Sequence, residues 1–136
     1  MCHVTGTAWW DIPKGRQDPG ESSLATVIRE TREETGLELM PDALVDLGVV
    51  YYREDKSLHL FVGHVSRSKV EPARCVCTTY FQDGRTGALR PEMDGFAWVA
   101  FEDVPRLCAK AMARLLVARL PLATLGALLP VAQCLA

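Results

Sequence analysis

The stretch RETREETG, residues 29–36, determines the fold prediction. In a helix it places Glu30, Glu33 and Glu34 on one face, because side chains three and four positions apart are neighbours on a helical surface. Each such like-charge pair costs about 0.2–0.5 kcal/mol. A bound cation would offset this repulsion, so the stretch predicts a metal site on a helix.

The predicted helix begins after Ser22, a favourable N-cap, and ends at Gly36, where a glycine can adopt the left-handed conformation. A stripe at helical spacing is predicted to be buried about a third of a turn from the glutamates. It consists of Leu24, Val27, Ile28, Thr31 and Thr35. The helix is therefore expected to pack on one side and to present its three carboxylates on another.

Strands are predicted on both sides of this helix. The first dozen residues resemble strand material, and a loop containing two prolines and two glycines (13–22) separates them from the helix. Further strands are predicted at 46–53, 57–65, 75–81 and 96–101. Asp103 and Pro105 then open a second amphipathic helix. This order predicts an α/β fold, with helices packed on a mixed sheet.

A longer pattern extends outward from the opening stretch. Its fixed positions are Gly15, Glu21, Arg29, Glu30, Glu33, Glu34, Gly36 and Leu37. This is the spacing of the Nudix box, and the chain resembles the MutT-like Nudix hydrolase family, with a Pro-Lys-Gly variant of the loop before the box. Thr31 stands where the family has an aliphatic residue, although its methyl group can still pack.

The resemblance implies an α/β/α sandwich over residues 1–118, and the apolar composition of residues 119–136 predicts a separate C-terminal tail. Only nine residues precede Trp10, so the N-terminal strand is predicted to be shortened, or else the natural chain begins further upstream. An exposed sheet edge is expected there, covered by the tail or by the partner of a homodimer.

The resemblance also implies roles for individual residues. The glutamates matching Glu30, Glu33 and Glu34 bind Mg²⁺ or Mn²⁺ in the family, and Arg29 helps to orient them. A further acidic ligand is expected outside the box, with Glu92 as the first candidate and Asp94 in reserve. Structural roles are expected for Gly15, Glu21 and Gly36. Which carboxylate acts as the general base stays open.

The chemistry can also be argued from the residue types. Hard cations such as Mg²⁺ take carboxylates, phosphate oxygens and water as ligands, and they neutralise charge on a phosphoryl group. We therefore expect a hydrolase that cleaves a diphosphate linkage, and the resemblance implies that its substrate is a nucleoside diphosphate derivative. Lys14 and Arg16 flank Gly15 and are candidate phosphate contacts. Lys14 stands where many relatives carry a second glycine, and this variant resembles the subgroups that act on dinucleoside polyphosphates, the triphosphate end of RNA and diphosphoinositol phosphates. The resemblance therefore implies a dinucleoside polyphosphate as substrate, with a nucleoside triphosphate as second choice.

The alternative is a non-catalytic Nudix-like module that binds a nucleotide and regulates another process. The complete glutamate triad favours the enzyme, because a binding module has no need of three mutually repelling carboxylates.

Composition excludes some other classes. The formal net charge of −2 argues against binding of duplex nucleic acid. Five cysteines without C-x-x-C spacing, and a beginning without a signal-peptide pattern, predict reduced thiols in the cytoplasm. The last 17 residues, 120–136, carry no charge but contain two prolines and a glycine, so packing on the domain or on a partner subunit is favoured over a membrane anchor.

Overall fold

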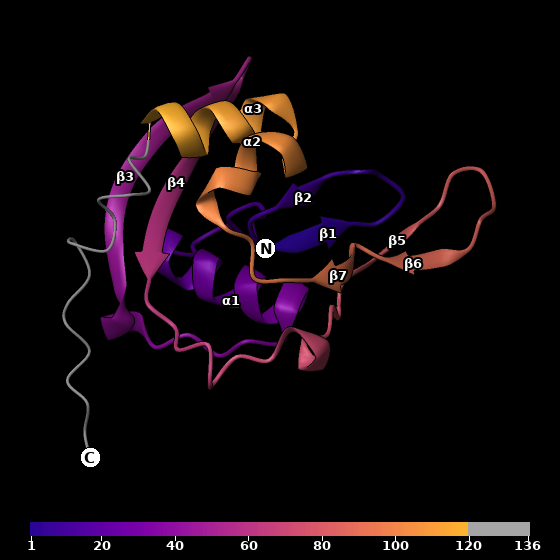
Figure 1. The fold of residues 1–136 in the computed structure, drawn as a ribbon, viewed down its shortest axis with the longest axis horizontal. Helices are drawn as coiled ribbons and strands as arrows, with labels where there is room; N and C mark the ends of the chain where they lie inside the picture. Colours follow the sequence, from indigo (N-terminus) through magenta and orange to yellow (C-terminus); the bar gives the residue numbers. More distant parts are fainter. Residues whose placement is uncertain (120–136) are drawn as a thin grey trace.

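The computed structural model describes residues 1–119 of the chain, and Figure 1 shows how its elements are arranged. Its strands are β1 (Cys2–Val4), β2 (Trp10–Asp11), β3 (Leu44–Arg53), β4 (Lys56–Gly63), β5 (Tyr80–Gln82), β6 (Leu89–Pro91) and β7 (Met93–Phe96). Its helices are α1 (Ser23–Thr35), α2 (Val104–Leu107) and α3 (Lys110–Arg114). Short 3₁₀ turns occur at Pro41–Ala43, Pro72–Arg74 and Phe101–Asp103, and a π turn at Leu115–Arg119.

Helix α1 confirms the prediction made from the opening stretch. The Ser22 side chain accepts a hydrogen bond from the backbone N–H of Ala25 at 3.1 Å, which caps the first turn. Gly36 ends the helix with φ 75°, and its N–H donates to the carbonyl of Arg32 at 2.7 Å.

The strands form three small antiparallel groups, ordered β2-β1-β7, β3-β4 and β5-β6. In residues 1–119, parallel pairing is confined to an isolated bridge between Trp10 and Cys108. The hairpin predicted from 46–53 and 57–65 is present as β3 and β4, with Asp55 in the turn at φ 58°. The α/β fold class is thus confirmed, and β1 is only three residues long.

Helices cover the β1–β2 ribbon on opposite sides. Figure 1 shows α1 below these strands and α2 and α3 above them, with the β3–β4 hairpin alongside. One core cluster joins β4 to the two late helices and contains Leu60, Val104, Cys108, Met112, Leu115 and Leu116. A second cluster contains Cys2, Cys77 and Met93. The loop from β2 leads directly into α1, and the candidate site lies on this loop and on α1.

Three local predictions were wrong. Segment 75–81 is a strand only from Tyr80, because the N–H groups of Val76 and Thr78 donate to the carbonyls of Thr35 and Glu33 near the end of α1. The strand expected at 96–101 is shifted back to β7. The second helix is interrupted at Cys108, which has extended backbone angles, φ −91° and ψ 153°.

No helix within residues 1–119 is long and apolar enough to cross a membrane. The predicted tail, apart from its first residue, lies outside the described residues.

Candidate metal and phosphate site

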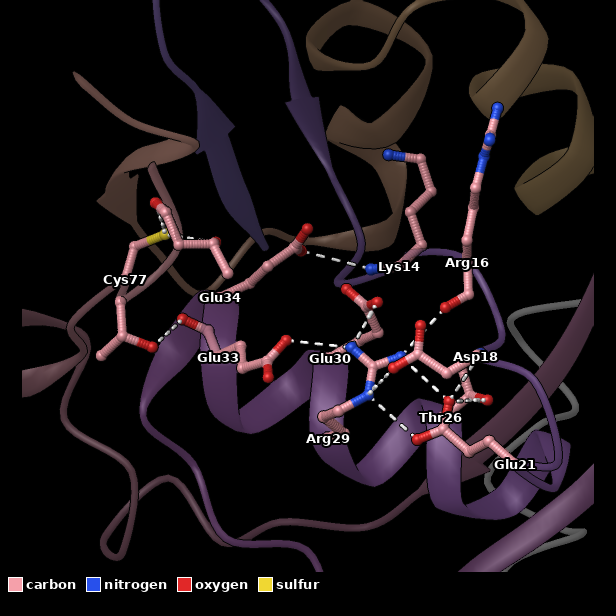
Figure 2. Close-up of polar contacts among 12 residues, drawn as sticks. Lys14, Arg16, Asp18, Glu21, Thr26, Arg29, Glu30, Glu33, Glu34 and Cys77 are labelled. Carbon is pink, nitrogen blue, oxygen red and sulfur yellow. Dashed lines mark hydrogen bonds and ion pairs between the residues drawn. The ribbon is translucent and has the colours of Figure 1, made fainter. Parts of the chain in front are cut away.

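Arg29 is the centre of the polar network on α1, as Figure 2 shows. Its Nε and Nη2 donate to the two carboxylate oxygens of Glu21 at 2.9 and 3.0 Å. Its Nη1 donates to Glu30 at 2.8 Å and to Glu33 at 3.0 Å. Its Nη2 also donates to the backbone carbonyl of Arg16 at 2.9 Å. A guanidinium has five N–H donors, so every donor of Arg29 is engaged.

Glu21 ties the loop to the start of α1. Besides Arg29, its carboxylate accepts from the backbone N–H of Asp18 at 3.1 Å and from the Thr26 hydroxyl at 2.8 Å. The hydrogen bond from Arg29 is the main reason why the pKa of Glu21 falls to about 2. Glu21 therefore stays ionised, and its carboxylate oxygens are already occupied by hydrogen bonds within the protein.

Gly15 is in close contact with the Glu30 side chain. A Cβ atom at Gly15 would lie 2.0 Å from the Glu30 carboxylate, far inside van der Waals contact. The loop can follow this course only because residue 15 has no side chain. The carboxylate of Glu30 is consequently held between Gly15 on one side and Arg29 on the other.

Glu34 differs from the other two glutamates because it is buried, with 2% of its surface exposed. This corrects the prediction that α1 presents all three carboxylates on an exposed face. The backbone N–H of Lys14 donates to Glu34 Oε2 at 3.2 Å. The pKa of Glu34 is raised to about 7, mainly by burial. The hydrogen bond and charge of Lys14 lower this pKa, whereas the negative charges of Glu30 and Glu92 raise it.

Glu92 lies between β6 and β7. Its backbone carbonyl accepts from Thr5 at 3.0 Å, and its N–H donates to Thr79 at 3.0 Å, which fixes its position. Its negative charge is the smallest of the causes that act on the pKa of Glu34. Asp94, the reserve candidate, is paired with His3 Nδ1 at 2.5 Å.

The two candidate phosphate contacts leave the loop with their side chains directed away from the glutamates (Figure 2). The ammonium of Lys14 lies 2.7 Å from Asp11 Oδ2, in an ion pair that is mostly shielded from solvent. Asp11 was not singled out in the sequence, although its spacing of three from Lys14 is a recognisable signal. Arg16 is exposed.

The donor chemistry of this site fits a hard divalent cation. The negative charges of Glu30 and Glu92 both raise the pKa of Glu34, and such a cation would relieve this repulsion. In residues 1–119, however, no group of three or more His, Cys, Asp or Glu side chains is arranged to hold a metal ion. Arg29 supplies positive charge at Glu30 and Glu33 in the present arrangement.

Comparisons with known sequences find a matching family and several relatives. A profile of the NUDIX domain matches residues 3–120. A 17.7 kDa protein of Enterobacteria phage T4, described as uncharacterized, is 41% identical over 92 residues, 66% of this chain and 60% of the relative.

Two named enzymes are also similar. The asymmetrical bis(5'-nucleosyl)-tetraphosphatase of Mus musculus is 37% identical over 71 residues, 48% of each chain. The putative 8-oxo-dGTP diphosphatase of Bacillus subtilis is 42% identical over 60 residues, 42% of this chain and 38% of the relative. The chain thus spans about half the length of the relatives it matches.

Proposed function

Because the chain belongs to the NUDIX domain family, we propose that it is a metal-dependent pyrophosphohydrolase acting on a nucleoside diphosphate derivative. The observation that carries the proposal is that a buried carboxylate, Glu34, shares helix α1 with Glu30 and Glu33, the two carboxylates that Arg29 bridges. A helix that needs only to pack would not gain from burying one carboxylate beside others.

Glu30, Glu33, Glu34 and Glu92 are our candidate ligands for Mg²⁺ or Mn²⁺. When bound, such a cation would lower the pKa of a coordinated water and neutralise phosphoryl charge. The protein residues would position the reactants. Arg29 and Glu21 hold α1 and the loop together, while the loop glycine, Gly15, allows close approach of the backbone to Glu30.

The reaction is hydrolysis of a phosphoric anhydride. Water attacks one phosphorus atom, the bond from that phosphorus to the bridging oxygen breaks, and two phosphorylated products leave with the elements of water divided between them. Burial holds part of the Glu34 population protonated near neutral pH in the metal-free protein.

For the substrate, we propose a dinucleoside polyphosphate, with a nucleoside triphosphate as second choice. Lys14 and Arg16 would contribute positive charge to a long polyphosphate. The name of the mouse relative, a bis(5'-nucleosyl)-tetraphosphatase, agrees with the first choice. The name of the B. subtilis relative, a putative 8-oxo-dGTP diphosphatase, agrees with the second. We further propose that residues 1–118 form the catalytic domain and that the protein acts in the cytoplasm.

A substrate panel tests this proposal. The values of kcat/KM for diadenosine tetraphosphate, ADP-ribose and the common nucleoside triphosphates should be compared in wild type and in Lys14→Gly. We expect diadenosine tetraphosphate to be preferred by wild type, and the preference to shrink in the variant. ADP-ribose as the best substrate, or an unchanged preference in Lys14→Gly, would refute the proposed substrate.

A further inference from the structure

An ion pair inside the loop before α1 has no role in the function proposed above. Asp11, at the end of β2, accepts from the Lys14 ammonium through Oδ2 at 2.7 Å, and from the backbone N–H of Ile12 through Oδ1 at 2.8 Å. Both oxygens are engaged, and the Asp11 side chain is only 13% exposed. The carboxylate is therefore fixed in position.

Lys14 is engaged at both ends. Its ammonium contacts Asp11, while its backbone N–H donates to Glu34 Oε2 at 3.2 Å. Figure 2 shows these two groups facing in different directions, with the backbone nitrogen toward Glu34 and the side chain extended away from it. One residue thus connects the end of β2 to a candidate metal ligand on α1.

We propose that Asp11 is a positioning residue: it holds Lys14 in place and, through the Lys14 backbone, holds the Glu34 carboxylate where it can bind a divalent cation. This rests on the proposed function, since it takes Glu34 as a metal ligand. Groups that orient a ligand affect metal affinity even though they do not touch the metal.

Asp11 can hold Lys14 in position because their ion pair is shielded from solvent. A charge left alone in a mostly buried position is unfavourable, so Asp11 and Lys14 constrain each other more strongly than an exposed pair would. Lysine has a long, flexible side chain, and without a partner at its end it would sample many rotamers. Loss of the pair would free residues 12–15, and Glu34 would lose its backbone donor.

A different role for the pair predicts the opposite result. If Asp11 merely competed with phosphate for the Lys14 ammonium, its removal would release that ammonium and strengthen polyphosphate binding. An ammonium has three donors, so Lys14 can hold Asp11 and still contact phosphate. The effect of Asp11→Asn on Mg²⁺ affinity separates the two roles.

The experiment is a double-mutant cycle on the full chain with Asp11→Asn, Lys14→Met and the double variant. Asp11→Asn can retain the oxygen that accepts from Ile12, but it removes the charge and replaces Oδ2, which faces the Lys14 ammonium, with an NH₂ donor. The control is Asp103→Asn, which breaks another carboxylate–cation pair of spacing three, with Arg106 at 3.0 Å, in an exposed place. Mg²⁺ affinity is measured from the rise of the melting temperature with Mg²⁺ alone, and KM for diadenosine tetraphosphate is measured separately.

We expect Asp11→Asn and Lys14→Met each to weaken Mg²⁺ binding roughly tenfold. The double variant should bind Mg²⁺ no more weakly than the weaker of the two single variants, and Asp103→Asn should bind it with wild-type affinity. Lys14→Arg, which keeps a cation for Asp11, should have a Mg²⁺ affinity close to that of wild type. Wild-type Mg²⁺ affinity in Asp11→Asn, or effects that multiply in the double variant, would overturn the inference alone. Mg²⁺ binding without turnover would overturn only the proposed function, and absence of Mg²⁺ binding in wild type would overturn both.

Discussion

Replacement of Gly15 by alanine should displace Glu30 without unfolding the protein. The new Cβ would lie 2.0 Å from the Glu30 carboxylate, whereas ordinary contact begins at 3.4 Å, so the carboxylate has to move by about 1.4 Å. It is the far end of a flexible side chain and can move, but it then leaves Arg29 Nη1, now 2.8 Å away. Because this pair is partly exposed, we expect the free energy of unfolding to fall by only about 1 kcal/mol.

The effect on turnover should be larger. A misplacement of about 1 Å in a reacting constellation can cost on the order of a hundredfold in rate, so kcat/KM of Gly15→Ala with Mg²⁺ should fall by about that factor. The matched control is Gly84→Ala, because no atom lies within 4 Å of a Cβ placed at Gly84. Thermal unfolding and steady-state kinetics are measured on both variants. If Gly15→Ala retained more than half of wild-type kcat/KM, the assignment of Glu30 to the reacting site would be refuted.

Three further predictions concern the charges of the site. Burial raises the pKa of Glu34 from 4.5 to about 7, so the folded state binds more protons than the unfolded state between these values, and metal-free stability should fall by about 3 kcal/mol as pH rises from 4 to 8. Denaturant titration should show this fall in wild type and not in Glu34→Gln. Chelation of divalent metal at pH 8 should lower the melting temperature of wild type, while Glu34→Gln should respond less. Arg29→Lys should lower both the melting temperature and kcat, the latter by about tenfold or more, since lysine cannot replace the two-pronged contact with Glu21; a kcat equal to that of wild type would contradict this role.

Helix α1 could be predicted from sequence because its determinants are local. Ser22 caps its beginning, Gly36 permits its end, and the spacing of the glutamates repeats with the helical turn. The same spacing brings Arg29 next to Glu30 and Glu33 on the helix surface. Local periodicity is therefore sufficient to predict the helix and the three glutamates that it carries.

Burial of Glu34 and the course of segment 75–79 depend on tertiary contacts instead. Glu34 is covered because the loop at Lys14 lies against the helix, which a helical pattern does not reveal. The segment around Thr78 has β-branched residues typical of a strand, but its N–H and hydroxyl both donate to the Glu33 carbonyl near the end of α1. The last carbonyls of a helix lack intrahelical donors, and here a segment remote in sequence supplies them.

The most direct test of the central claim is Mg²⁺-dependent turnover by wild type and Glu34→Gln, followed by ³¹P NMR of diadenosine tetraphosphate and nucleoside triphosphates. We predict that wild type splits an anhydride bond only when a divalent metal is present, and that Glu34→Gln, still folded by thermal unfolding, loses roughly a hundredfold or more in kcat at saturating Mg²⁺. Nucleotide binding without any cleavage by wild type, or wild-type turnover by Glu34→Gln, would contradict the account.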